Sequence, residues 1–272
     1  MSVPYKLYKG DCLEIMPTLE GVGVVITDPP YVGLVGGTTI TIDGDAKRRN
    51  NSVTIGDEWS ASLDWMDTAW ELCKFGMIVF CSHRSVDIVK QKFPENAVSL
   101  ATWHKRNAAP TVRNVPILTT EFIWYFKKES GMFWRKLFTM YDIPTLSSGF
   151  TATERVTNKD GSTFHPTQKP VLLMKKLLLS VPENAVVLDP FMGTGTTGVA
   201  CAEMRIPFIG IERDPKYYSI AEKRIKQAAQ QPALFHVAQQ SVQRTGGESG
   251  QQNLFSAGEV LPAKVTRQST RR

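Results

Sequence analysis

Four consecutive residues, Asp28-Pro29-Pro30-Tyr31, have the chemistry of a site that binds an amino group. They follow the apolar run 22–27, which is typical of a strand, and open α/β folds bind ligands where such strands end. Two prolines remove two backbone N–H donors, which leaves the Asp28 carboxylate and backbone carbonyls as acceptors for an NH2 group. The Tyr31 ring offers a face for stacking a purine or pyrimidine. An ordinary turn after a strand would look similar, so a second motif has to decide.

A glycine-rich turn provides that second motif. Residues 188–198 read LDPFMGTGTTG, after an apolar strand at 185–188 and before a helical stretch at 197–204. The glycines allow a tight turn and a close approach of a ligand to the backbone at the start of a helix. The next expected strand, 207–211, leads into Glu212, whose carboxylate can accept both hydroxyls of an adenosine ribose. The same glycine spacing is typical of nicotinamide or flavin enzymes, so the turn alone does not choose between them and a methyltransferase.

The order of the two motifs along the chain separates these alternatives. A dinucleotide-binding fold begins with its glycine turn and needs several βα units after it, but only residues 199–272 follow here. The other strands must therefore lie upstream, and they are expected at 5–9, 22–27, 76–81, 98–104 and 121–126, with helices at 64–73 and 85–92. The sequence thus predicts an α/β fold with a doubly wound, mostly parallel sheet that is circularly ordered, with the catalytic half first.

With these motifs in this order, the chain resembles the beta group of DNA amino-methyltransferases over roughly residues 5–227. In that group an Asp-Pro-Pro-Tyr motif precedes a Phe-x-Gly-x-Gly motif. Three further segments are similar to family segments. Residues 10–12 match the segment whose acidic residue contacts the cofactor's adenine, residues 103–127 include the strand pair beside the base pocket, and residues 165–170 match the cofactor segment that opens the helix before the glycine turn.

The resemblance implies S-adenosylmethionine as cofactor and a set of site residues. The catalytic residues would be Asp28, Pro29, Pro30 and Tyr31. The cofactor-binding residues would be Asp11, Cys12, Asp28, His165, Lys169, Asp189, Phe191, Gly193, Thr194, Gly195, Thr196, Glu212 and Arg213. Within the family, Asp at the first position of the four-residue motif goes mainly with the 6-amino group of adenine, and Ser mainly with the 4-amino group of cytosine. Adenine in duplex DNA is therefore the expected target, reached by base flipping, with cytosine as the alternative.

Contacts with DNA have to come from local basic patches. The net charge of +6 favours a polyanionic partner, but about half of it lies in residues 228–272. One candidate segment, 32–58, contains Lys47, Arg48 and Arg49. A second, 127–163, is an insertion that carries target recognition in the family, and it contains Trp134, Arg135 and Lys136. Lys105 completes the expected DNA-binding set, although either segment could also be a solvated surface loop.

The composition predicts one main domain followed by a tail. With 272 residues, 42% of them hydrophobic, the chain can bury a core, and the methyltransferase domain is expected to span 1–227. The glutamine-rich residues 228–272 are expected to be disordered. Residues 231–235 and 251–255 both read Gln-x-x-Leu-Phe, which resembles peptides that dock onto the bacterial sliding clamp. The clamp is therefore a candidate partner beside double-stranded DNA, and a homodimer is left open.

The remaining composition excludes several classes of protein. The four cysteines and four histidines lack the spacing of a disulfide framework or a zinc site, so no metal is expected. The chain starts without an apolar signal segment, and no apolar run approaches about 18 residues. A cytoplasmic enzyme is the expectation.

Overall fold

The computed structural model describes residues 4–30, 62–106, 119–128, 138–146, 154–157, 161, 164 and 167–231. These residues all belong to the first of two compact units, Met1–Ala233. Eight strands form one sheet, and their bounds are β1 Tyr5–Lys9, β2 Val22–Thr27, β3 Gly76–Cys81, β4 Ala97–His104, β5 Thr120–Lys127, β6 Met140–Asp142, β7 Val186–Asp189 and β8 Phe208–Glu212. The helices are α1 Cys12–Ile15, α2 Asp64–Leu72, α3 Val86–Lys92, α4 Val171–Leu178, α5 Thr196–Met204 and α6 Pro215–Gln230, with 3-10 turns η1 Met16–Thr18 and η3 Pro94–Asn96.

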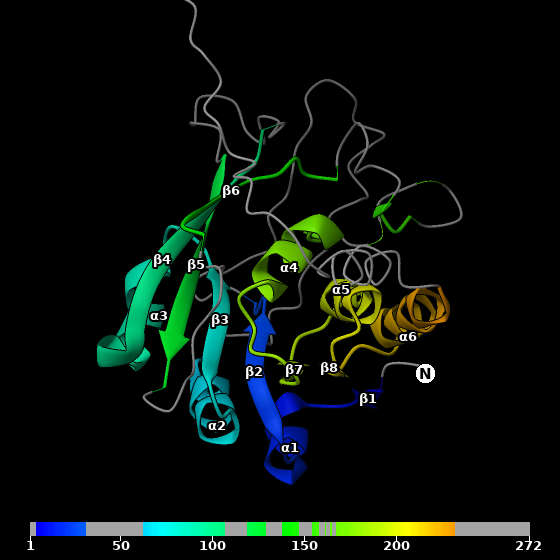
Figure 1. Ribbon diagram of the computed structural model, residues 1–272, viewed down its shortest axis with the longest axis horizontal. Coiled ribbons are helices and arrows are strands. Elements are labelled where there is room, and N and C mark those ends of the chain that lie inside the picture. Colours follow the sequence, from blue (N-terminus) through cyan, green and yellow to red (C-terminus); the bar gives the residue numbers. More distant parts are fainter. Residues whose placement is uncertain are drawn as a thin grey trace, which may run out of the picture. The chain divides into compact units, whose positions relative to one another are not determined.

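The strands lie in the order β1-β8-β7-β2-β3-β5-β4-β6 (Figure 1). Neighbours from β1 to β3 are parallel, β5 is antiparallel to both β3 and β4, and β6 is parallel to β4. The expected α/β fold with a mostly parallel sheet is confirmed, and the strands and helices predicted from the sequence begin and end within one residue of their observed bounds.

Helices cover both faces of the sheet, as a doubly wound fold requires. Alternate residues of β2 face opposite ways, so that Val24 and Ile26 join one buried cluster and Val25 joins the other. The first cluster includes side chains of α4, α5 and α6, and the second includes side chains of α1, α2 and α3. Strands buried on both faces explain why the segments 22–27 and 76–81 are continuous apolar runs rather than alternating ones.

Strand β6 was not expected, because residues 127–163 match no sheet motif in the sequence. It is only three residues long and has exposed Met140 and Asp142 on either side of buried Tyr141. It pairs with β4, and two long-range side-chain contacts support this pairing: the Tyr125 and Tyr141 hydroxyls pair in the core, and Trp103 Nε1 donates to the carbonyl of Ile143, just after β6, at 2.7 Å. The expected insertion therefore returns to the sheet, and only a structure could reveal this pairing.

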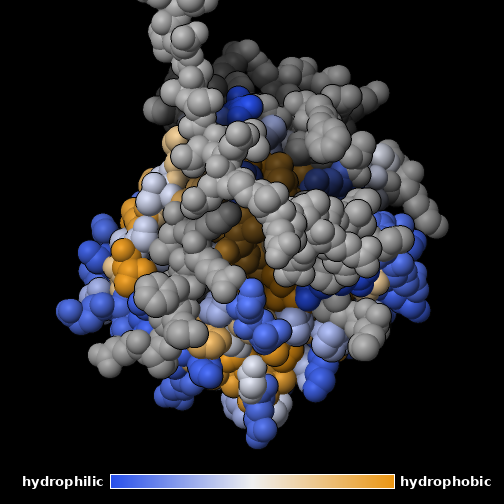
Figure 2. Space-filling model, in the orientation of Figure 1, coloured by the Kyte–Doolittle hydropathy of each residue, from blue (hydrophilic) through white to orange (hydrophobic). Residues whose placement is uncertain are grey.

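Apolar residues are visible in two areas of this face. Figure 2 shows them in a recess between the grey atoms, where Figure 1 places helix α4, and again lower down, interspersed with charged residues. Helix α4 exposes Leu172 and Leu179. Within the described part of the chain, none of the helices combines the length and the apolar character that a membrane crossing needs.

Candidate active site

The candidate site lies at one edge of the sheet, where the parallel strands end. Strands β2, β7 and β8 deliver Asp28, Asp189 and Glu212 to this edge, because parallel strands have their carboxyl ends on the same side. Strand β5 runs the opposite way, so its first residues, including Glu121, also lie at this edge. Residues far apart in the sequence therefore meet here.

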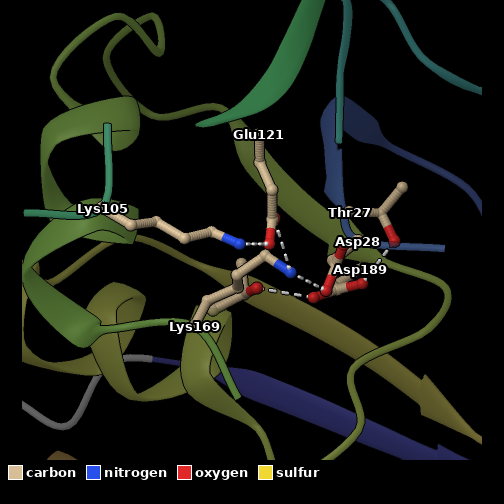
Figure 3. Close-up of polar contacts among 7 residues, drawn as sticks. Thr27, Asp28, Lys105, Glu121, Lys169 and Asp189 are labelled. Atoms are coloured by element: carbon tan, nitrogen blue, oxygen red, sulfur yellow. Dashed lines mark hydrogen bonds and ion pairs between the residues drawn. The ribbon is translucent and has the colours of Figure 1, made fainter. Parts of the chain in front are cut away.

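Four charged side chains form an alternating chain at this edge (Figure 3). The Lys169 ammonium donates a hydrogen bond to Asp28 Oδ2 and lies 3.1 Å from Glu121 Oε2. The Lys105 ammonium lies 2.6 Å from Glu121 Oε1. Only 6% of the Lys169 side chain is exposed, so the inner contacts of this chain are largely shielded from water.

These ion pairs keep the inner groups charged. Burial raises the pKa of Glu121, but the ammonium groups of Lys169 and Lys105 outweigh burial and lower that pKa to about 2. Burial lowers the pKa of Lys169, but the carboxylates of Asp28 and Glu121 outweigh it, and the net effect is a pKa above the usual value. Glu121 is therefore an anion and Lys169 a cation throughout the physiological range.

Asp189 ties the catalytic and glycine motifs together. Its Oδ1 accepts hydrogen bonds from Thr27 Oγ1 at 2.7 Å and from the Phe191 N–H at 3.1 Å, and its Oδ2 accepts one from Thr197 Oγ1 at 2.5 Å. Its side chain is 3% exposed, and burial raises its pKa to about 6 although the hydrogen bonds lower it. Its two oxygens thus have partners on β2, in the glycine turn and on α5, which is the arrangement of a residue that positions the turn.

Two glycines of the turn lie against helix α6. Gly195 has φ +82°, and a Cβ atom there would lie 2.9 Å from Ala221 Cα. A Cβ on Gly198 would lie 2.4 Å from Ile225 Cδ1. These glycines were expected to allow a tight turn and the approach of a ligand, and the structure adds a packing role between α5 and α6.

Helix α6 also holds the turn through Arg224. Its Nη1 donates to the Thr194 carbonyl at 2.5 Å and lies 3.2 Å from Thr194 Oγ1. Thr194 and Thr196 were expected to bind cofactor, and both are buried. The position of Arg224 on an amphipathic helix gave no signal of this contact in the sequence.

A small pocket beside the glycine turn brings together five of the thirteen residues expected to bind cofactor. It is lined by Gly10, Asp11, Cys12, Pro190, Phe191, Glu212 and Arg213. Glu212 Oε2 accepts from the Gly193 N–H at 2.9 Å, and its Oε1 accepts from the Asp214 N–H at 2.7 Å. Burial, the largest cause, raises the pKa of Glu212 to about 7, assisted by the charges of Asp214 and Asp189 and opposed by the two backbone hydrogen bonds.

The composition of this pocket fits an adenosine. Glu212 has a carboxylate, a group that can accept hydrogen bonds from ribose hydroxyls, and Phe191 supplies an aromatic wall, held edge-on by Trp65 with ring centroids 5.2 Å apart. Asp11 Oδ1 accepts from the Leu13 N–H and so caps α1, while its Oδ2 lies 3.7 Å from Arg213 Nη1. Burial raises the pKa of the Cys12 thiol to about 12, so this cysteine stays neutral.

Two lysines have partners that the sequence did not indicate. The Lys169 ammonium, expected at the cofactor, contacts Asp28 and Glu121. The Lys105 ammonium, expected at the DNA, pairs with Glu121. Both expectations remain predictions. Glu121 itself was not among the expected site residues, and its position at the start of a strand was the signal that could have found it.

Gln168, next to Lys169, anchors a neighbouring segment. Its Oε1 accepts from the Val156 N–H at 3.0 Å, and its Nε2 donates to the Glu154 carbonyl at 2.8 Å. Glu154 Oε2 in turn accepts from the Val171 N–H at 2.8 Å at the start of α4. These contacts fix the backbone that carries Lys169 toward Asp28.

Eight expected site residues lie outside the described residues: Tyr31, Lys47, Arg48, Arg49, Trp134, Arg135, Lys136 and His165. The second clamp-like peptide, 251–255, also lies outside them. Among the residues that the structure does describe, no cluster of three or more His, Cys, Asp or Glu side chains could hold a metal ion.

A family model described as DNA methylase, N6_N4_Mtase, matches residues 22–223, a span that contains both motifs and the ion-pair chain. The chain belongs to this family. It is 30% identical over 254 residues to the Type II methyltransferase M.HinfI of Haemophilus influenzae, and the matched region covers 83% of this chain and 69% of that relative. It is 26% identical over 251 residues to M2.MboI of Moraxella bovis, and here the matched region covers 81% of this chain and 87% of the relative. The protein is thus a DNA methyltransferase, and a nicotinamide-dependent oxidoreductase is not supported.

Solved structures agree with the family. A complex of M1.HpyAVI with S-adenosylmethionine has a TM-score of 0.58 and 28% identity, covering 81% of this chain and 99% of that one. The PvuII cytosine-N4-specific DNA methyltransferase has a TM-score of 0.59 at 15% identity, covering 84% and 92%, which shows a shared fold. S-adenosylmethionine is the cofactor of this family, and the pocket of Glu212 and Phe191 has the chemistry to hold its adenosine.

Proposed function

We propose that this methyltransferase transfers a methyl group to the 6-amino group of adenine in duplex DNA, and that it has the motif order of the beta group. The observation that carries the proposal is the position of Asp28. Its carboxylate follows β2, the strand beside β7. Strand β7 leads into the glycine turn and the pocket of Phe191 and Glu212, which is proposed to hold the adenosine. An acceptor for an amino group and a pocket for a methyl donor therefore lie at neighbouring strand ends.

The cofactor would be held by the pocket residues. Glu212 accepts the ribose hydroxyls, Asp11 contacts the adenine, and Phe191 packs against its ring. When bound there, S-adenosylmethionine would supply an electrophilic methyl carbon on a sulfonium sulfur, which would keep the electron pair of the carbon–sulfur bond when the methyl group moves to the amino nitrogen.

Asp28 and Pro29 orient the target amino group. The Asp28 carboxylate accepts one amino proton and the Pro29 carbonyl accepts the other, which directs the nitrogen lone pair at the methyl carbon. The nitrogen becomes positively charged as it is methylated, and the negative charge of Asp28 stabilises it until a proton leaves to Asp28 or to water. The base has to leave the helix for this geometry, and Tyr31 would stack on it. Positioning rather than acid–base chemistry supplies most of the rate.

Adenine is favoured over cytosine by the residue type at position 28. The fold is shared with a cytosine-N4-specific enzyme, so the fold does not choose between the two bases. Mass analysis of nucleosides from unmethylated DNA treated with the protein should give 6-methyladenine. A result of 4-methylcytosine as the sole product would replace adenine by cytosine in the proposal.

The two halves of the site can be tested separately. Asp28→Asn should leave binding of S-adenosylhomocysteine nearly unchanged and abolish methyl transfer, because it removes the charge beside the amino nitrogen. Glu212→Gln should weaken that binding by roughly 1.5–3 kcal/mol, because it loses hydrogen bonds to a charged group. Calorimetric titration measures both. Equal loss of cofactor affinity in the two variants would contradict the assignment.

The wider function follows from the named relatives and from residues outside the described part. M.HinfI and M2.MboI are Type II methyltransferases, which supports a role in a restriction-modification system for this chain. The basic residues Lys47, Arg48 and Arg49 and the segment around Trp134, Arg135 and Lys136 remain proposed DNA contacts. Docking of 251–255 on the sliding clamp is tested by replacing Leu254 and Phe255 with Ala, which should abolish clamp retention in a pull-down and leave methylation of short duplexes unchanged.

A further inference from the structure

The alternating chain of Lys105, Glu121, Lys169 and Asp28 extends beyond the residues that the proposed transfer uses. Its members come from four separate segments: the end of β4, the start of β5, the approach to α4 and the end of β2. Each ammonium also lies over an aromatic ring, Lys169 Nζ at 5.2 Å from the Phe80 ring centroid and Lys105 Nζ at 5.3 Å from that of Trp103. Several elements of the fold therefore converge to hold these charges in place.

Stability alone does not account for such an arrangement. Shielding charges from water costs free energy, and well-packed apolar side chains of similar volume are often as stable or more stable than a buried ion pair. Each carboxylate oxygen of Glu121 contacts a different ammonium group: Oε1 contacts Lys105 and Oε2 contacts Lys169. Glu121 thus stands between two cations, the inner one of which contacts the catalytic carboxylate. Charged groups held in this way beside a reaction centre are candidates for a functional role.

We propose that Glu121 is a positioning residue of the methyl-transfer site: it holds the Lys169 ammonium in place, and Lys169 in turn fixes the Asp28 carboxylate that receives the target amino group. This inference rests on the proposed function. Glu121 does not touch the base or the methyl donor in this scheme and acts only through Lys169. The two acids and two lysines together carry no net charge, so the cluster adds no positive charge beside the amino nitrogen. Asp28, which receives the amino group, is the negative group nearest to that nitrogen as it becomes positive.

Loss of the Glu121 charge would have two effects on this geometry. Without an anion between them, the Lys105 and Lys169 ammonium groups repel each other, so Lys169 shifts against Asp28. The cluster also gains a net positive charge next to a nitrogen that must itself become positive, which disfavours transfer. A shift of about 1 Å in a catalytic group can lower a rate about 100-fold, so the expected fall for Glu121→Gln is about 10- to 100-fold.

The test measures single-turnover transfer of a labelled methyl group from S-adenosylmethionine to unmethylated plasmid DNA by the 272-residue protein. Glu121→Gln should show the slower transfer, with affinity for S-adenosylhomocysteine within about twofold of the unaltered protein because the adenosine pocket is separate. The control is Asp67→Asn, which removes the carboxylate of another ion pair, 2.5 Å from Lys92, in the helices α2 and α3. This control should transfer methyl groups at the normal rate.

A second substitution separates positioning from a general structural role. Adding Lys105→Met to Glu121→Gln removes the repelling cation and restores neutrality with only Lys169 and Asp28, so transfer should recover several-fold. A purely structural role predicts a further loss, because a second contact is removed. If Glu121→Gln alone proves unstable in thermal unfolding, the double variant is compared with Lys105→Met and should transfer more slowly.

The outcomes distinguish this inference from the proposed function. Absence of methyl transfer by the unaltered protein on any DNA would overturn the proposed function and the inference together. Normal transfer by Glu121→Gln, or a double variant slower than Glu121→Gln, would overturn the inference alone and leave the assignment of Asp28 in place.

Discussion

Lowering the pH from 8 to 6 is expected to weaken binding of S-adenosylhomocysteine by about tenfold, through protonation of Glu212. Ribose hydroxyls donate hydrogen bonds, so they bind the ionised carboxylate and disfavour the protonated one. Burial raises the pKa of Glu212 from 4.5 to about 7, which moves this ionisation into the physiological range. Cofactor binding and proton release from Glu212 are thereby linked.

The magnitude follows from the pKa. At pH 6 a group with a pKa near 7 is about one-tenth ionised, so the apparent affinity falls about tenfold, or about 1.4 kcal/mol, below its plateau above pH 8. The charged neighbours of Glu212 are Asp11, Arg213, Asp214 and Asp189. Of these, Asp189 has its pKa raised to about 6, but its oxygens bind Thr27, Thr197 and the Phe191 N–H and do not belong to the pocket lining.

Calorimetric titration with S-adenosylhomocysteine in two buffers of different ionisation enthalpy measures both quantities. Near pH 6.5 binding should release about 0.75 of a proton, and Glu212→Gln should bind weakly with little dependence on pH. Affinity that stays constant between pH 6 and 8, with no buffer-dependent heat, would refute the link between Glu212 ionisation and cofactor binding.

Three further predictions concern stability, measured by urea unfolding of the ligand-free protein. Because folding raises the pKa of Glu212, its contribution to stability is fully present below about pH 4.5 and is lost as the pH rises through 7. The stability of Glu212→Gln should therefore rise by up to about 3 kcal/mol relative to the unaltered protein between pH 4 and 8. A stability difference that stays constant over this range would contradict the prediction. Gly195→Ala should lose about 2–5 kcal/mol of stability, from the left-handed φ and the contact with Ala221. Gly161→Ala, also at positive φ but with no atom of the described residues within 4 Å of its Cβ, should lose only about 1–2 kcal/mol, and similar losses in the two variants would refute the packing role. Tyr141→Phe should cost about 1–3 kcal/mol of stability, because it leaves the Tyr125 hydroxyl without the Tyr141 hydroxyl, and adding Tyr125→Phe should recover part of that loss. Unchanged stability in Tyr141→Phe would show that the paired hydroxyls contribute nothing.

The fold was largely predictable because its signals are local. Apolar runs such as 22–27 and 76–81 mark strands buried on both faces, and the glycine turn marks the start of α5. The order of the motifs then placed Asp28 and Glu212 at one sheet edge. Strand β6 could not be predicted in this way, since three residues with a single buried side chain have no periodicity and gain their pairing from distant partners such as Trp103 and Tyr125.

The site was predictable in its residue types and less so in its contacts. Asp11, Phe191 and Glu212 share a pocket, as the motifs indicated. The partners of Lys105 and Lys169 depend on where four separate segments meet, and no spacing in the sequence encodes this. The packing of Gly195 against α6 was missed for the same reason, because the helix that makes Cβ unacceptable lies further along the chain.

Under the proposed role of residues 127–163 in target recognition, the attachment of β6 limits how DNA specificity could be exchanged between relatives. An exchange of residues 129–153 as one block would replace Tyr141, the core partner of Tyr125, and the backbone at Ile143 that accepts from Trp103. A transplant that retains residues 138–146 of the host, and replaces only the stretches on either side, would keep those core contacts. The segment is therefore modular only in two separate pieces, and hybrid enzymes designed with one cut on each side are expected to lose stability before they change the sequence that they recognise.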